Sequence, residues 1–113
     1  MNNCLFCKIA AGEIPSTKVY EDETTLAFRD INPQAPVHVL VIPKKHVSGW
    51  YDAQNESDAE LAHLMRVAAM VAKSENIVES GFRVVSNCGD DAQQTVKHLH
   101  LHVMRGKKMD GQM

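Results

Sequence analysis

Three of the six histidines lie close together in the segment His98-Leu99-His100-Leu101-His102. In an extended strand alternate side chains share a face, so the three imidazoles would line one side at intervals of about 6–7 Å while the leucines enter the core. Neutral imidazole is a good nucleophile near neutral pH, and a neighbouring imidazolium can stabilise anionic oxygens. The pattern therefore indicates nucleophilic chemistry, with phosphorus as the natural electrophile. A metal site built from all three histidines and a solvated polar face are the alternatives.

A second candidate for chemistry is the cysteine pair in Cys4-Leu5-Phe6-Cys7. A Cys-x-x-Cys pair has the spacing of half a tetrahedral zinc site, and two further ligands would be needed to complete it. Two inert reduced thiols and a redox pair are the alternatives. The remaining cysteine, Cys88, makes the number odd, which argues against a disulfide framework and favours a reducing cytoplasm.

Several short segments rich in β-branched and apolar residues predict the strands that must carry these side chains. The expected strands are 18–20, 25–29, 37–42, 82–86 and 97–104. The first two would form a hairpin across an acidic turn, and 37–42 is apolar on both faces, as in the middle of a sheet. A polar loop, 87–95, would join the last two strands.

The clearest helix begins at Ser57, because Ser57-Asp58-Ala59-Glu60 is a capping box. Apolar residues then recur every three or four positions and predict one buried stripe that ends before Gly81. The expected stripe is Leu61, Leu64, Met65, Ala68, Val71 and Ala72. Residues 5–11 could form a short helix that Gly12 stops. One long helix among several strands predicts an α+β domain whose antiparallel sheet is covered on one face.

The composition excludes several classes of protein. With 113 residues, 44% of them apolar and 23% charged, the chain has the length and composition of one compact domain, residues 1–113. Its net charge of −2 gives no basic field for a nucleic-acid polymer. No apolar run approaches the roughly 18 residues of a membrane helix, and residues 1–9 lack the positive leader of a secretory signal. We expect a cytoplasmic protein that binds neither a nucleic-acid polymer nor a membrane, and its modest core favours dimerisation.

Residues 98–104 follow the pattern His-φ-His-φ-His-φ-φ, in which φ is apolar. This pattern resembles the signature of the histidine-triad (HIT) family. Segments 28–38 and 41–46 look like its Hint branch, the histidine-triad nucleotide-binding proteins, and the resemblance extends from about Phe6 to Met104. It implies a HIT-like α+β fold with a five-stranded antiparallel sheet, one long helix and one short N-terminal helix, assembled as a homodimer.

The resemblance also implies an activity: hydrolysis or transfer at the α-phosphate of a purine nucleotide, commonly a nucleoside phosphoramidate or an aminoacyl adenylate, without an organic cofactor. His100 would attack phosphorus and hold the nucleotidyl group until water removes it. His102 would hydrogen-bond phosphate oxygens, and Thr95 would orient or protonate the leaving nitrogen. His38 would support the triad, and a core histidine with a satisfied hydrogen bond is the alternative. This interpretation requires a free His100 at the mouth of a nucleotide cleft.

The residues implied to bind the nucleotide include those of the loop before the triad. They are Asp30, Ile31, Asn87, Gln93, Gln94, Thr95, His100 and His102. Asp30 would accept hydrogen bonds from the ribose hydroxyls with Ile31 near the base, or else it caps a turn. Asn87 would reach phosphate or ribose, or else it is a turn residue. The Hint branch usually has Gly-Gly-Gln-Ser before the triad, where this chain has Ala92-Gln93-Gln94-Thr95, and the tail 107–113 lacks the Trp-Pro-Pro ending of animal relatives.

Some bacterial HIT proteins pair an N-terminal Cys-x-x-Cys with a histidine after the central strand and with the first triad histidine. Carried onto this chain, the zinc ligands are Cys4, Cys7, His46 and His98. Four protein ligands leave no position for water, so the zinc would be structural, and His100 and His102 would stay free. Two other functions remain open: a dinucleoside polyphosphate hydrolase or nucleotidylyltransferase on the same fold, and a non-catalytic purine-nucleotide-binding regulatory module.

Overall fold

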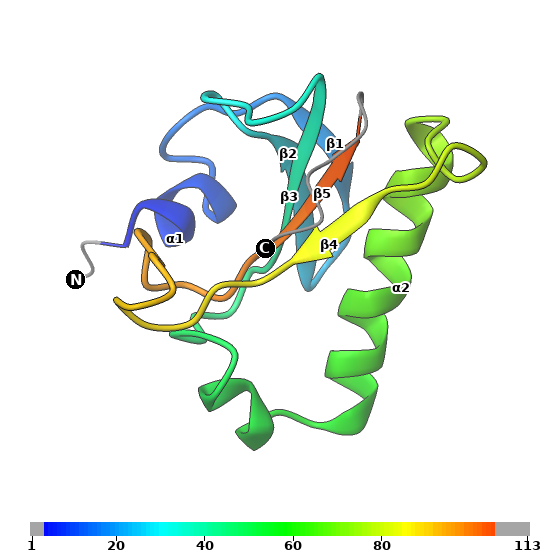
Figure 1. The fold of residues 1–113 in the computed structure, drawn as a ribbon. Coiled ribbons are helices and arrows are strands. Elements are labelled where there is room, and N and C mark those ends of the chain that lie inside the picture. The colour runs from blue at the N-terminus through cyan, green and yellow to red at the C-terminus, as the bar shows by residue number, and fades with distance from the viewer. Residues whose placement is uncertain (1–3, 106–113) are drawn as a thin grey trace.

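The computed structural model describes residues 4–105 and contains a five-stranded antiparallel sheet in the order β1-β2-β3-β5-β4, with a helix against each face (Figure 1). The strands are β1 (Lys18–Glu21), β2 (Thr25–Arg29), β3 (Val37–Pro43), β4 (Arg83–Val85) and β5 (Leu101–Arg105). The helices are α1 (Leu5–Ala10), the short 3-10 helix η1 (Asp52–Asn55) and α2 (Asp58–Ser74). The predicted HIT-like α+β fold, with its hairpin, central strand, long helix and short N-terminal helix, is confirmed. The tail 107–113 lies outside the described residues.

Helix α2 begins as predicted, because the Ser57 side chain accepts from the Glu60 backbone N–H and the Glu60 side chain accepts from the Ser57 backbone N–H. Its buried stripe differs from the predicted one by one position. Met65 is 75% exposed, whereas Val67 is fully buried. Val67 lies four residues before Val71 and therefore shares its face, which turns Met65 toward solvent.

The two faces of the sheet carry two separate apolar clusters. The first packs α2 against the sheet and includes Ala27, Val39, Val41, Val67, Val71, Leu101 and Val103. The second packs α1 against the opposite face and comprises Phe6, Ile9, Leu26, Phe28, Leu40 and Ile42. The prediction of a sheet covered on one face was therefore incomplete, because α1 covers part of the other face.

Strand β5 is shorter than predicted, since it begins at Leu101 and not at residue 97. Its pairing with β3 runs from Val37↔Arg105 to Val41↔Leu101. Two positions further along β3 stands Pro43, which has no N–H to continue the ladder. His98 and His100 therefore lie on an extended segment before β5. Side chains still alternate there: Leu99, Leu101 and Val103 join the α2 cluster, and the histidines face the opposite side.

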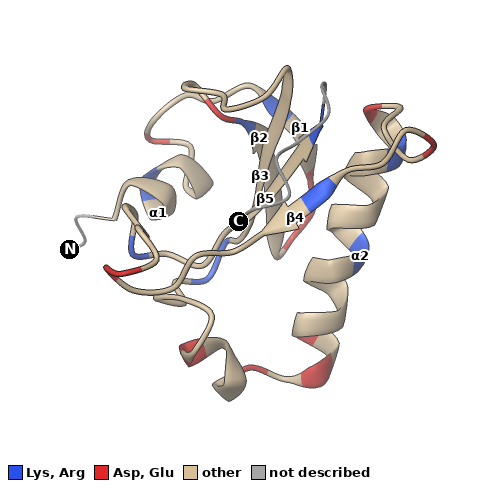
Figure 2. Ribbon diagram, in the orientation of Figure 1, with Lys and Arg blue, Asp and Glu red and all other residues tan. Residues whose placement is uncertain are grey.

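Charged side chains are distributed over several elements of the described chain. Figure 2 shows Lys and Arg spread over separate elements rather than gathered on one face. Acidic residues mark the first turn of α2, where they complement the positive end of the helix dipole. Among residues 4–105, no helix has the length and apolar character needed to cross a membrane.

Candidate functional site

A pocket of about 300 Å³ lies on the α1 side of the sheet, against β2, β3 and β5. Its apolar lining includes Phe6, Ile9, Phe28 and Leu40. Its polar lining includes Asp30, Thr95, His100 and His102. Ile31 also lines the pocket, so the structure brings five of the predicted site residues together. His100 is only 5% exposed, so the expectation that it stands at the mouth of a cleft is wrong; it lines the inner wall of the pocket, and a ligand must enter the pocket to meet it.

The protons on His38 and His102 are set by a chain of hydrogen bonds that starts from the backbone. The Gln34 backbone N–H donates to His38 Nδ1 at 2.9 Å. Because this nitrogen accepts, neutral His38 carries its proton on Nε2, which donates to His102 Nδ1 at 2.8 Å. His102 must then carry its own proton on Nε2. A histidine that lines the pocket therefore has an N–H available for an anionic oxygen.

His100 has the opposite arrangement of proton and lone pair. Its Nδ1–H donates to the backbone carbonyl of His98 at 2.6 Å, since a carbonyl can only accept. The lone pair is left on Nε2. The rings of His100 and His102 meet nearly edge to face, with centroids 4.9 Å apart. One pocket therefore holds an imidazole lone pair next to an imidazole N–H.

These histidines are neutral near pH 7. Burial lowers the pKa of His38 and of His100. Burial, together with the neighbouring His100 and His38, lowers the pKa of His102 from 6.5 to about 4. Protonation of any one of them would put a buried charge beside another imidazole, so the proton positions described above persist through the neutral pH range.

Asp30 lines the pocket and also caps a turn. Its Oδ1 accepts from the Asn32 backbone N–H at 2.9 Å, and its Oδ2 lies 3.5 Å from His38 Nε2. Asp30 therefore caps a turn, as the alternative interpretation predicts, and its carboxylate also lines the pocket. Ile31 follows it in the lining and is 89% exposed. Both residues stand where a ligand in the pocket would meet them.

The loop before the triad divides into residues that line the pocket and residues that do not. Thr95 is exposed and lines the pocket, whereas Asn87, Gln93 and Gln94 are not part of its lining. The buried Gln94 side chain donates to the carbonyls of Ser48 and Val96 and accepts from the Gly89 N–H. Gln93 has a φ of 62°, the left-handed conformation that glycine adopts without strain. The predicted nucleotide contacts of these three residues thus stay predictions.

Four predicted metal ligands lie together at the N-terminal end of α1. We call Cys4, Cys7, His46 and His98 the Cys/His group; their ligand atoms lie within 4.8 Å of one another. Cys4 Sγ lies 3.2 Å and Cys7 Sγ 3.4 Å from His98 Nδ1, and Cys7 Sγ lies 3.2 Å from His46 Nδ1. Sulfur and nitrogen ligands of one tetrahedral Zn²⁺ are separated by roughly 3.5 Å. The spacing of the group is therefore close to that of a Cys2His2 site.

The proton on His98 favours metal binding by its Nδ1. The His98 Nε2–H donates to the Pro43 carbonyl at 2.8 Å, which leaves the Nδ1 lone pair facing the two cysteines. Burial also lowers the pKa of His98 and so favours the neutral form that a metal needs. The third cysteine, Cys88, is exposed and lies outside the group.

Asp30, His38 and His102, which we call the Asp/His group, also bring possible ligand atoms within 4.8 Å of one another. This group is poorly suited to a metal, because the Gln34 N–H places the His38 proton on Nε2, the nitrogen that faces the group. Among the described residues, neither cluster of possible metal ligands contains all three triad histidines. The alternative of a single three-histidine metal site is thus disfavoured.

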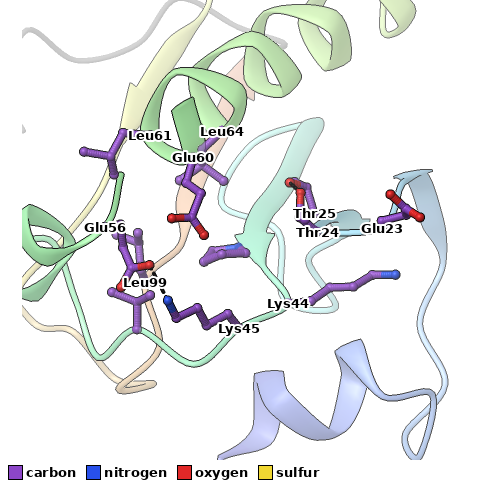
Figure 3. Close-up of a pocket in the computed structure, with 12 residues that line it drawn as sticks. Glu23, Thr24, Thr25, Lys44, Lys45, Glu56, Glu60, Leu61, Leu64 and Leu99 are labelled. Carbon is purple, nitrogen blue, oxygen red and sulfur yellow. Dashed lines mark hydrogen bonds and ion pairs between the residues drawn. The ribbon is translucent and has the colours of Figure 1, made fainter. Parts of the chain in front are cut away.

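A separate pocket of about 280 Å³ lies between the N-terminal part of α2 and the ends of β2 and β3 (Figure 3). Its floor includes Leu61, Leu64 and Leu99, and none of its lining residues is a histidine. Lys45 at its rim pairs with Glu56 at 2.6 Å. The rim thus supplies the counter-charge for Lys45, and none of the three triad histidines lines this pocket.

Sequence reasoning missed two contributors to the site. Phe6, to which the sequence analysis gave no role, packs against His100, and the Gln34 backbone N–H fixes the His38 proton. The apolar wall was detectable, because Phe28 and Leu40 stand two residues from Asp30 and His38 and so share their faces. The Gln34 contact has no signature in sequence, since any residue but proline supplies a backbone N–H.

The chain is similar to several known proteins. Residues 11–109 match the family model described as HIT domain. The chain is 49% identical over 108 residues to a 14 kDa zinc-binding protein of Zea mays, covering 94% of this chain and 84% of the relative. A HIT family hydrolase from Clostridium thermocellum is 47% identical, with a TM-score of 0.91, over 100% of this chain and 98% of that chain. A histidine triad nucleotide-binding protein from Candida albicans is 38% identical, with a TM-score of 0.81, over 89% of this chain and 73% of that chain.

Proposed function

Because the chain belongs to the HIT domain family, we propose that it is a hydrolase that binds a purine nucleotide beside α1 and cleaves at the nucleotide's α-phosphate. The observation that carries this proposal is the opposed protonation of two neighbouring imidazoles, a lone pair on His100 Nε2 and an N–H on His102 Nε2. Nucleophilic attack on phosphorus needs a lone pair, and the charge that grows on the phosphate oxygens needs a donor. The substrate class is a nucleoside phosphoramidate or an aminoacyl adenylate.

In the first step, the Nε2 lone pair of His100 forms a bond to the α-phosphorus. The bond from phosphorus to the leaving nitrogen or oxygen breaks, and the leaving atom keeps that electron pair. A leaving nitrogen takes a proton that Thr95, exposed in the pocket lining, relays from solvent. The nucleotidyl-imidazole that forms is cationic, and its Nδ1–H still donates to the His98 carbonyl, which stabilises the charge.

In the second step, water attacks phosphorus from the side opposite His100. The bond between phosphorus and Nε2 breaks, the imidazole returns to its neutral form, and the proton of the water passes to solvent. The products are a nucleoside monophosphate and unmodified enzyme. Throughout, the His102 N–H donates to a phosphate oxygen, and its direction is maintained by His38 and by the Gln34 backbone.

The rest of the pocket suits a nucleoside. The Asp30 carboxylate can accept from both ribose hydroxyls, and Ile31 with the apolar wall offers packing surface to a base. The name of the Candida albicans protein, histidine triad nucleotide-binding protein, supports the same ligand class.

We propose a structural zinc ion at the Cys/His group, where Cys4, Cys7, His46 and His98 would supply all four ligands. Such an ion would tie α1 to the segment that precedes β5. The name of the Zea mays relative, zinc-binding protein, supports this proposal. The group needs reduced thiols, which is consistent with a cytoplasmic location.

We also propose that two copies associate through the outer face of β4 and the adjoining side of α2. β4 is an edge strand, which can pair with a second copy. Beside it lies a hollow of about 720 Å³ whose lining includes Trp50, Met65 and Val84. These side chains are 62%, 75% and 45% exposed, an apolar surface typical of an interface.

The catalytic proposal is tested by incubating the protein with an adenosine phosphoramidate, quenching in mildly alkaline solution and recording intact mass and turnover. We expect the wild type to gain one nucleotidyl group, and His100→Ala to lose both the adduct and at least about 10³-fold in kcat. His63→Gln is the matched control, because His63 lies on α2 and bonds Asp22 outside the pocket.

Other outcomes would point elsewhere. Turnover that survives in His100→Ala contradicts a covalent mechanism. Tight nucleotide binding without adduct or turnover in the wild type favours the regulatory module. Faster cleavage of dinucleoside polyphosphates than of phosphoramidates favours the alternative hydrolase.

The dimer is tested by light scattering across a range of protein concentrations. Met65→Glu should give a monomer, because it places a carboxylate in the apolar interface. Met70→Glu is the control, since Met70 is also exposed on α2 but is not part of the hollow. A wild-type protein that stays monomeric at high concentration would contradict the proposal.

A further inference from the structure

We propose that metal occupancy of the Cys/His group controls the position of the His100 nucleophile, with Phe6 as the positioning residue between the two sites. This inference rests on the function proposed above. There the zinc ion only holds α1 in place, whereas here it also determines the position of His100. Two independent connections in the structure carry it, one through the backbone of His98 and one through the ring of Phe6.

The backbone connection is His98 itself. Its imidazole Nδ1 faces the sulfurs of Cys4 and Cys7 at 3.2 and 3.4 Å, and its carbonyl accepts the His100 Nδ1–H at 2.6 Å. The ring is fully buried and its other nitrogen bonds the Pro43 carbonyl, so it has little freedom to move alone. A displacement of the His98 ring toward or away from an ion is therefore transmitted to the carbonyl that orients the nucleophile.

The side-chain connection is Phe6, which stands between the two cysteines in the sequence and is 6% exposed. Its ring meets His100 edge to face, with centroids 5.0 Å apart and an interplanar angle of 89°. It also contacts His98 at 6.1 Å and Phe28 at 5.6 Å. Any shift of the cysteines therefore moves a ring that packs directly on the nucleophile.

Helix α1 cannot hold this arrangement by itself. It has six residues, and isolated helices of that length are unstable in water. Its position depends on the apolar cluster below it and on the contacts of Cys4 and Cys7. Displacement of a reacting group by about 1 Å can reduce the rate by about 100-fold, so loss of the ligand bonds has a chemical consequence.

The test is a zinc titration of metal-free protein, with Zn²⁺ alone as the added ligand. Three quantities are followed: zinc bound by chelator competition, the ¹⁵N signals of the His100 ring, and the rate of nucleotidyl-histidine formation in a single turnover. We expect zinc to sharpen the signals of the Nδ1–H form and to raise the rate by roughly tenfold, with one shared midpoint. His46→Ala removes a ligand that does not contact His100, and it should move all three midpoints to zinc concentrations at least about tenfold higher.

Phe6→Leu keeps an apolar side chain but removes the ring edge. It should bind zinc normally while losing most of the zinc-dependent increase in kcat, and because Phe6 also lines the pocket, KM is measured alongside to separate weaker nucleotide binding. Lys8→Ala, on the same helix but outside the pocket lining and the Cys/His group, should behave as wild type. If Phe6→Leu does not fold, His46→Ala still decides the question.

The outcomes separate this inference from the proposed function. Equal adduct rates and unchanged His100 signals with and without bound zinc overturn the coupling and leave the hydrolase intact. The coupling is also overturned if the zinc concentration at the midpoint of activation is unchanged in His46→Ala, or if the protein binds no zinc. Zinc-dependent His100 signals without any adduct support the coupling and overturn the covalent mechanism.

Discussion

The Cys/His group and the Asp/His group are similar in composition but suited to opposite chemistry. Each places histidine and either acidic or thiol ligand atoms within 4.8 Å of one another, and each takes one histidine from residues 98–102. The difference lies in the backbone group that bonds the ring nitrogen facing away from the cluster, on His98 in the Cys/His group and on His38 in the Asp/His group. A carbonyl, that of Pro43, takes the His98 proton away from the cysteines, whereas an N–H, that of Gln34, drives the His38 proton toward His102.

The comparison indicates that one backbone group decides whether a histidine presents a lone pair or an N–H to the cluster around it. A carbonyl at the far nitrogen creates a lone pair facing inward, as metal coordination requires. An N–H at the far nitrogen creates an inward proton, as anion binding requires. Residue type alone does not distinguish the two clusters.

The sharpest way to break this distinction is to remove one ligand from each group. Cys7→Ser should weaken zinc binding by at least about 100-fold, because a hydroxyl is a poor replacement for a thiolate. Asp30→Asn should leave zinc affinity and stoichiometry unchanged. Both are measured by chelator competition and metal analysis. Equal loss of zinc in the two variants would show that the Asp/His group also holds the metal.

A smaller effect is expected from the hydrogen bond between His38 and His102. His38→Leu removes the donor to His102 and should lower kcat by about 10–100-fold, while zinc content stays unchanged. His38→Gln keeps an N–H near the same place and should recover part of that loss. Steady-state kinetics on both variants measure the effect. If the Leu and Gln variants were equally active, the hydrogen bond from His38 to His102 would have no role in turnover.

The pH dependence of stability tests the protonation of His102 in the Asp/His group. The pKa of His102 is lowered to about 4 in the folded protein, so between pH 6.5 and 4 the unfolded chain takes up a proton that the folded chain does not. The free energy of unfolding should therefore be highest above pH 6.5 and fall as the pH drops toward 4. Urea denaturation of metal-free protein measures this, and His102→Gln should show a shallower decline. An equal slope in the variant would assign the effect to other groups.

The smallest effect is expected in the loop next to the pocket. Gln93→Gly relieves a left-handed backbone conformation and should raise the free energy of unfolding by about 0.5 kcal/mol, the strain relieved exceeding the added chain entropy. Ala92→Gly, at a neighbouring position without positive φ, should lower it instead. Zinc binding should not change in either variant. Destabilisation by Gln93→Gly would mean that the Gln93 side chain makes a contact worth more than the strain.

Local signals in the sequence predicted most of the fold. The capping box at Ser57 fixed the start of α2, and the apolar run 37–42 identified the central strand. The burial of Val67 in place of Met65 was not predictable from spacing, because a stripe of small residues is compatible with more than one rotation of the helix. The late start of β5 depends on Pro43 in a strand distant in sequence.

The candidate site was predictable where side-chain types carry the chemistry. The four members of the Cys/His group and the pocket residues Asp30, Thr95, His100 and His102 were named from the sequence, and the structure places each set together. Proton positions were not predictable, because they depend on backbone groups of Gln34, Pro43 and His98. The loop residues Gln93 and Gln94 were named by position in a motif, and their backbone N–H groups bond the carbonyls of Asp90 and Gly89 within the loop.

The early end of the β3–β5 ladder has a consequence for how reactivity is encoded. Where the pairing ends, the Pro43 carbonyl accepts from the His98 Nε2–H and the His98 carbonyl accepts from the His100 Nδ1–H, so two successive backbone carbonyls set the tautomers of two imidazoles. Pro43, which lacks a backbone N–H, thus marks both the end of the β3–β5 pairing and the start of the segment whose histidines face the pocket and the Cys/His group.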